Sequence, residues 1–235
     1  MVPLSSTAPS CLVSNEWVCG EYFRTRSDII ADALVQHIWI TVVSVLLGLA
    51  FAFPLALLAR RYRRLEGIVV GATTAVYTIP SLALFALLLP FTGLSPATVI
   101  LGLALYSLTI LVRNIIEGLK AIPDEVRESA VGMGYARTRM LFGVDLPLAL
   151  PTIMAGLRVA AVSTVALTTV GSIVGYGGLG NLLLTAVDSQ FKAQVLTAGV
   201  LCVLLAIGFD VLLVGLQRVL TPWTRRPGRS RRATA

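Results

Sequence analysis

Long apolar runs without a formal charge are the feature of this sequence that most restricts its fold. The first run extends from Ala33 to Ala59, and a helix needs roughly 20 such residues to cross the hydrocarbon core of a bilayer. Only 13% of the residues are charged, against roughly 25% in typical soluble domains. We therefore expect an all-α polytopic membrane protein with about five transmembrane helices, at Ala33–Ala59, Gly67–Phe91, Leu94–Val112, Leu148–Ile173 and Ala193–Val219.

Positive charge is concentrated at the ends of these runs. The net charge of +7 would by itself suit a nucleic-acid-binding protein, but arginines at the ends of apolar runs are typical of membrane topology. Because basic loops stay in the cytosol, we expect the N-terminus outside, the C-terminus inside, and no nucleic-acid partner. The two arginine clusters are Arg60, Arg61, Arg63 and Arg64, and then Arg218, Arg225, Arg226, Arg229, Arg231 and Arg232.

This topology divides the chain into three parts. Residues 1–33 are expected to form a polar extracytoplasmic tail, residues 34–220 the transmembrane domain, and residues 221–235 a basic cytosolic tail near anionic headgroups. Cys11 and Cys19 lie in the first part, where an oxidising compartment would allow them to pair. The sequence leaves a disulfide and two free thiols as alternatives.

A polar segment between the third and fourth runs falls on the cytosolic side in this topology. Pro123 suits the first turn of a helix, and the carboxylates of Asp124 and Glu125 favour the positive end of its dipole. Gly134 stands where glycine often ends a helix. A short helix is therefore expected between Pro123 and Gly134.

This short helix carries an apolar stripe. Val126, Ala130 and Met133 stand at i, i+4 and i+7, the spacing of one helix face. The stripe is too small to form a domain, so we expect a partner to cover it. A second short helix is predicted near 138–144, ending against Leu146-Pro147.

The spacing within this segment resembles the EAA loop of ABC importer permeases. Ser129 replaces the first alanine of the motif and Val144 replaces the usual isoleucine, while the remaining motif positions match. The resemblance implies a coupling helix that docks into a cleft of a separate cytosolic ATPase, and an ordinary amphipathic loop is the alternative. The residues expected to couple are Glu128, Ser129, Ala130, Gly134, Val144, Leu146 and Pro147.

Three further stretches resemble permeases for glycine betaine, carnitine, choline or proline: YTIPSLALFALLLP at 77–90, LYSLTILVRNIIEGL at 105–119, and GLRVAAVSTVALTTVGSIVGYGGLG at 156–180. The resemblance covers about residues 34–220. It implies a multi-pass permease subunit of the cell membrane that imports osmoprotectants by alternating access. Its implied partners are an ATPase dimer, a second identical or paralogous permease protomer and an extracytoplasmic binding protein. The alternatives are an ABC permease for another small solute, of methionine or phosphonate type, and an ATP-independent scaffold or channel.

The sequence offers no catalytic chemistry of its own. A nucleotide phosphate loop needs a lysine after glycine, but neither Lys120 nor Lys192 follows one. The run Gly175–Gly180 spells G-x-G-x-x-G, yet it follows a membrane span and no βαβ unit surrounds it. We expect it to form a sharp turn before a short helix at Asn181–Gln190. No metal or other cofactor is expected, and ATP would be bound by the partner subunit.

Two ionisable residues lie inside the predicted spans, where charge is costly and usually functional or paired. Arg158 is in the fourth span and Asp210 in the fifth, at similar depths from the cytosolic end. Opposite charge at equal depth predicts an ion pair between these spans. The alternative is that each side chain reaches the cytosolic interface separately.

Aromatic residues near the spans are candidates for a translocation path, because quaternary ammonium ligands favour aromatic cages. The candidates are Tyr77, Tyr106 and Tyr176, with Pro80; ordinary core or interface positions are the alternative. Pro80 is expected to kink the second span and to free a backbone carbonyl. His37, at the outer end of the first span, is expected in the interfacial aromatic belt.

Overall fold

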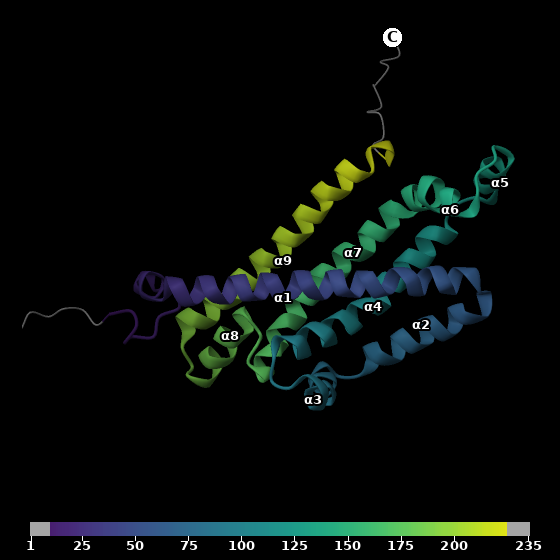
Figure 1. Cartoon of the computed structure of the whole chain (residues 1–235). Helices are drawn as coiled ribbons and strands as arrows, with labels where there is room; N and C mark the ends of the chain where they lie inside the picture. The colour runs from purple at the N-terminus through teal and green to yellow at the C-terminus, as the bar shows by residue number, and fades with distance from the viewer. Residues whose placement is uncertain (1–9, 225–235) are drawn as a thin grey trace, which may run out of the picture.

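The computed structural model describes residues 10–224, and every regular element within this range is helical. A π-helical turn, η1, precedes α7, and 3-10 turns η2 and η3 follow α7 and α9. The elements are α1 (Gly20–Arg61), α2 (Arg63–Thr78), α3 (Ser81–Thr92), α4 (Pro96–Lys120), α5 (Asp124–Gly132), α6 (Arg137–Met140), η1 (Leu141–Asp145), α7 (Leu146–Thr168), η2 (Thr169–Val174), α8 (Leu179–Asp188), α9 (Lys192–Leu220) and η3 (Pro222–Thr224). Figure 1 shows this arrangement.

The predicted number of spans is confirmed. Within the described residues, α1, α4, α9 and the continuous helical run Arg137–Val174 are each long and apolar enough to cross a membrane. The pair α2 and α3 passes the same test together, so the total is four or five. The described residues therefore form an all-α membrane domain with a few shorter helices, of which α8 is apolar.

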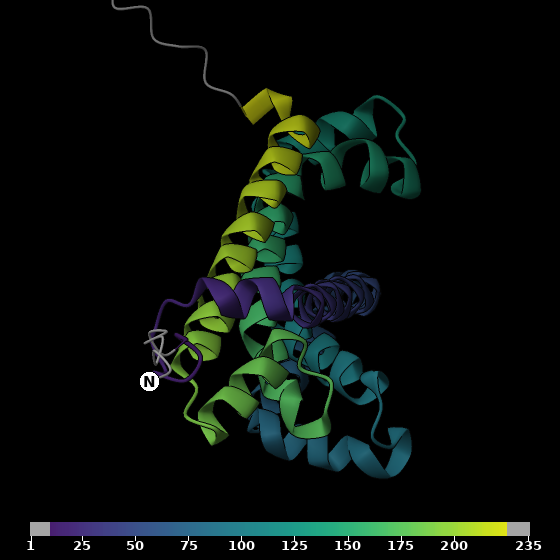
Figure 2. The same cartoon turned by 90° about the vertical axis from the view of Figure 1, so that its left-hand side faces the viewer.

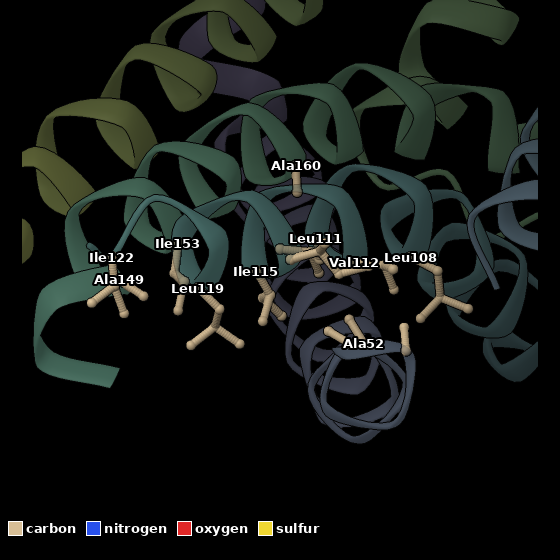
Figure 3. Close-up of a cluster of buried hydrophobic side chains, with 13 residues drawn as sticks. Ala52, Leu108, Leu111, Val112, Ile115, Leu119, Ile122, Ala149, Ile153 and Ala160 are labelled. Atoms are coloured by element: carbon tan, nitrogen blue, oxygen red, sulfur yellow. The ribbon is translucent and has the colours of Figure 1, made fainter. Parts of the chain in front are cut away.

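Helix α4 forms the centre of the molecule. It packs against α1 and against α7, and alanines on α1 and α7 let those helices approach the larger aliphatic side chains of α4 (Figure 3). Close approach at small residues is the usual way for membrane helices to gain packing contacts. The buried core includes Ala52, Ala56, Leu111, Val112, Ile115, Leu119, Ala149, Ile153 and Ala160.

Different helices and loops lie at the two ends of the molecule. At one end, Lys120 at the end of α4 forms an ion pair with Glu66 of α2, and α5 and α6 project beyond the bundle (Figures 1 and 2). At the other end lie α3, α8 and the N-terminal loop (Figure 1). The connections thus alternate between the two ends as the topology requires. The assignment of the α5 end to the cytosol remains a prediction.

The second span is broken instead of kinked. Helices α2 and α3 meet at Ile79 and Pro80 with a bend of 99°. Proline lacks the N–H that would continue the helix and its ring clashes with the preceding turn. The break therefore falls where a kink was expected, but α3 turns away from the direction of α2.

The N-terminal region is more ordered than a polar tail. Helix α1 begins at Gly20 and not near Ala33, since the charged residues in between are compatible with a helix outside the hydrocarbon core. Cys11 and Cys19 form a disulfide. The loop that it closes packs against the turn between α8 and α9, where Asn15 donates to the carbonyl of Gln190 and accepts from the amide of Lys192, both at 3.0 Å. Of the basic C-terminal tail, residues 225–235 lie outside the described range.

Candidate functional site

Helix α5 has the boundaries that its sequence predicts. Pro123 stands immediately before its first residue, and Gly134 adopts a left-handed backbone with φ of +80°. The amide of Tyr135 bonds to the carbonyl of Ala130 at 3.0 Å, and the amide of Gly134 bonds to that of Val131 at 2.9 Å. These two bonds form a Schellman motif, which satisfies carbonyls that a helix end would otherwise leave unpaired. The glycine is thus needed for its backbone conformation.

The apolar stripe of α5, which was expected to be covered by a partner, is covered in part by the chain itself. Ala130 is buried and Val126 packs against the α1–α4–α7 core, so the chain covers these two residues itself. Met133 is 71% exposed and Val131 is 60% exposed. The surface left for a partner therefore consists of Val131 and Met133 together with the exposed polar residues Glu128 and Ser129.

The second short helix does not end against Leu146-Pro147, so that prediction is wrong. Helix α6 continues through the π-helical turn η1 directly into α7, and Pro147 stands in the first turn of α7. Proline has no N–H to continue the helical hydrogen bonds, and the wider π turn accommodates it at this junction. Val144 and Leu146 are half-buried at this junction, and Leu146 packs against the central core.

One residue next to the motif escaped the sequence analysis. The side chain of Asp145 is 3% exposed, and its two carboxylate oxygens contact two arginines from different helices. Arg60 Nη2 lies 2.8 Å from Oδ2, and Arg127 Nε lies 3.2 Å from Oδ1. Arg60 lies in the last turn of α1 and Arg127 lies in α5, so this buried carboxylate joins three elements. We call Arg60, Arg127 and Asp145 the Asp145 network.

The structure brings Arg158 and Asp210 together. Arg158 Nε donates to Asp210 Oδ1 at 2.8 Å and Nη2 donates to Oδ2 at 3.0 Å. Parallel bonds between a guanidinium and a carboxylate add geometric specificity to the charge attraction. The two side chains are about one third exposed and line a groove of about 570 Å³ between α7 and α9. The pair adds a polar contact between α9 and α7.

The aromatic candidates separate into two places. The rings of Tyr77 and Tyr106 make an edge-to-face contact with centroids 5.7 Å apart, next to the break at Pro80. The hydroxyl of Tyr106 donates to the carbonyl of Ile79, so it satisfies a backbone group at the break. Tyr176 packs instead against the separate cluster around Phe85 and Val99. The described residues therefore do not join the three tyrosines into one cage.

The interfacial position expected for His37 is wrong. Its side chain is fully buried, and its Nε2 lies 3.0 Å from the carbonyl oxygen of Val165 in α7. The glycine-rich turn crosses directly over it: a Cβ on Gly178 would lie 2.6 Å from that of His37. Gly178 also has φ of +56° and donates to Gln36 at 3.1 Å. The glycine-rich run forms the sharp turn that was expected before a short helix, and its glycines also allow that turn to pack closely against His37.

Within residues 10–224, no three histidine, cysteine, aspartate or glutamate side chains are placed to hold a metal ion.

Comparison with known proteins gives a consistent picture. Residues 37–226 match the family described as "Binding-protein-dependent transport system inner membrane component". The chain is 36% identical to the glycine betaine/carnitine/choline transport system permease protein OpuCD of Bacillus subtilis, over 89% of this chain and 92% of that protein. It is 34% identical to the osmoprotectant import permease protein OsmW of Salmonella typhimurium, over 86% and 96% of the two chains.

Solved structures show the same fold. A chain of the methionine ABC transporter MetNI in an inward-facing conformation superposes with a TM-score of 0.74 at 22% identity, covering 84% of this chain and 98% of that one. A chain of an amino acid ABC transporter superposes with a TM-score of 0.70 at 16% identity, covering 86% and 99%.

Proposed function

This chain belongs to the family of inner-membrane components of binding-protein-dependent transport systems, and on that premise we propose that it is the permease subunit of an ATP-driven osmoprotectant importer. The proposed solutes are glycine betaine, choline, carnitine or proline. The observation that carries the proposal is 36% identity, over nearly the full length of both chains, to a glycine betaine/carnitine/choline permease. The likeness to a methionine transporter, at 22% identity, supports the fold alone.

Energy would come from other subunits. No glycine-lysine phosphate loop occurs in the sequence, so we propose that a partner ATPase dimer binds and hydrolyses ATP. The exposed surface of α5, with Glu128, Ser129, Val131 and Met133, is the proposed contact with that ATPase. A second permease protomer and an extracytoplasmic binding protein would complete the importer, and the cycle would proceed by alternating access.

Uptake of labelled glycine betaine tests the substrate proposal. Cells with and without the chain are compared at low and high osmolarity, with the ATPase and binding protein shown to be present. We expect chain-dependent uptake that choline or carnitine reduces and methionine leaves unchanged. Competition by methionine alone, or no chain-dependent uptake, would assign the transporter to another solute.

Co-purification tests the docking surface. Glu128→Arg reverses a charge on the exposed face of α5, and we expect it to release the ATPase from the complex. Glu117→Arg is the matched control, since Glu117 lies on α4 outside this surface. Retention of the ATPase by Glu128→Arg would contradict the assignment of α5 as the docking element.

A further inference from the structure

Asp145 is the only carboxylate that is buried among residues 10–224. We propose that it is a positioning residue for energy coupling, which makes the coupling helix α5 move together with the ends of α1, α4 and α7. The proposal rests on the proposed function, because it takes α5 as the element on which the ATPase acts.

Each oxygen of the carboxylate serves a different element. Oδ2 contacts Arg60 in the last turn of α1, and Oδ1 contacts Arg127 in α5. Asp145 itself lies at the end of η1, immediately before α7. If the carboxylate left either arginine, a buried charge would lose a partner at a large cost in free energy. The three elements are therefore expected to keep their relative positions when α5 is displaced.

Arg127 extends the same connection to α4. Its Nη2 donates to the carbonyl of Leu119, which lies in the last turn of α4, where carbonyls have no partner within the helix. Its Nη1 donates to Asp124 in the first turn of α5 at 3.2 Å. All three nitrogens of this guanidinium are thus used, and they orient α5 relative to the central helix.

The rest of α5 provides little other attachment. Val126 packs against the central core and Ala130 is buried, while Glu128, Ser129 and Val131 are exposed. A helix attached on one side by two small or medium apolar residues would tilt under load. The Asp145 network supplies a second, directional attachment on the same side.

A nearby ion pair is more exposed than the Asp145 network and provides a control. Lys120 and Glu66 pair at the same end of the molecule, but their side chains are 49% and 29% exposed. Exposed pairs contribute little to stability, and this one joins α2 to α4.

The test uses transporter assembled with its ATPase and binding protein in proteoliposomes. Arg127→Gln removes the connection to α5 but leaves Asp145 paired with Arg60; Asp145→Asn removes the central charge; Asp145→Glu preserves it. Lys120→Gln is the matched control. ATP hydrolysis and uptake of labelled glycine betaine are measured on equal amounts of complex.

We expect the ATPase to co-purify with every variant. Glycine betaine imported per ATP hydrolysed should fall about tenfold in Arg127→Gln and Asp145→Asn, within the usual range of coupling between two sites. It should fall less in Asp145→Glu and stay unchanged in Lys120→Gln. An unchanged ratio in Arg127→Gln would overturn the proposal, as would loss of the ATPase, which would assign the network to shaping the docking surface. If Asp145→Asn does not accumulate, Arg127→Gln decides.

A distance measurement that needs no transported solute tests this proposal separately from the proposed substrate. Spin labels at Glu125 on α5, outside the proposed ATPase contact, and at Phe91 at the end of α3, both exposed, are placed in a Cys202→Ser background. ATP should change their separation in the otherwise unaltered transporter and not in Arg127→Gln. An equal change in the spin-label separation in both transporters would overturn the proposed role of the Asp145 network. If this result holds while glycine betaine is not imported, only the substrate proposal fails.

Discussion

Helices α4 and α9 are both apolar spans, yet the molecule uses them in opposite ways. In the most apolar 18-residue window of α4, 72% of the residues are buried, whereas in that of α9 none is. Lipid tails are as apolar as a leucine side chain, so apolarity places a helix in the membrane without deciding what it packs against. Packing in this protein is decided by complementary small and large side chains around α4.

Helix α9 is attached by polar contacts and by a smaller apolar cluster with α8. Its first turn meets the disulfide-closed N-terminal loop through Asn15, and its middle meets α7 through Asp210 and Arg158. About half of its apolar side chains are exposed and available to lipid or to another protomer, while Ala198, Leu201 and Leu205 pack in a cluster with α8. Stability should therefore respond to aliphatic truncation in α4 and to polar substitution in α9.

The largest effect is expected in the core. Ile115→Ala removes a fully buried side chain at the contact of α4 with α1 and α7, and such truncations typically cost about 2–5 kcal/mol of unfolding free energy. Denaturant titration in detergent micelles measures it. Val203→Ala on α9, which is 59% exposed, is the control and should change stability by less than about 0.5 kcal/mol. Equal losses at the two sites would contradict the comparison.

A smaller effect is expected at the intramembrane pair. Arg158→Ala and Asp210→Ala should each weaken the attachment of α9, and the double variant should lose less than the sum of the single losses, because either change already breaks both hydrogen bonds. The same titration, analysed as a double-mutant cycle, isolates the interaction. Additive losses would show that the two side chains act independently.

At the broken span, Tyr106→Phe removes one hydroxyl from α4 and leaves the carbonyl of Ile79 without it. We expect a loss of about 1 kcal/mol, typical of a single hydrogen bond. Tyr77→Phe, which keeps the ring contact with Tyr106, should have a smaller effect. Thermal unfolding of the two variants side by side compares their losses of stability. A larger loss for Tyr77→Phe would contradict the role of the Tyr106 hydroxyl at the break.

The smallest effect is expected at the start of α9. Asn15→Ala removes two exposed hydrogen bonds to the α8–α9 turn, so global stability should change by less than about 1 kcal/mol. Amide hydrogen exchange in the first turn of α9 should nevertheless accelerate, because that turn opens locally. Ser14→Ala, whose hydroxyl bonds to the nearby Ser10 and Glu16, is the control. Unchanged exchange in Asn15→Ala would contradict the proposed attachment.

The parts of the fold that depend on local sequence were predictable. Apolar runs located the spans, and Pro123 and Gly134 bounded α5, because helix ends have chemical requirements that single residues meet. The depth of Arg158 and Asp210 predicted their contact for a similar reason, since two opposite charges inside a membrane have few alternatives.

Features that depend on three elements at once were not predictable. Asp145 is one acid among several in a polar segment, and its burial depends on where α1 and α5 end. His37 has the position of an interfacial residue in sequence, but the glycine turn after α7 covers it. The charged residues before Ala33 gave no apolar signal, so the first part of α1 was assigned to a tail although it is helical.

The disulfide between Cys11 and Cys19 has a consequence for biogenesis. Such a bond persists in oxidising compartments and is reduced in the cytosol, so its state records the side of the membrane on which the N-terminus was delivered. A chain inserted with its N-terminus in the cytosol would carry two thiols instead, and a membrane-impermeant maleimide would mark them in inside-out vesicles or permeabilised cells but not in intact cells. The oxidation state of Cys11 and Cys19 thus reports the orientation of each molecule after its synthesis is complete.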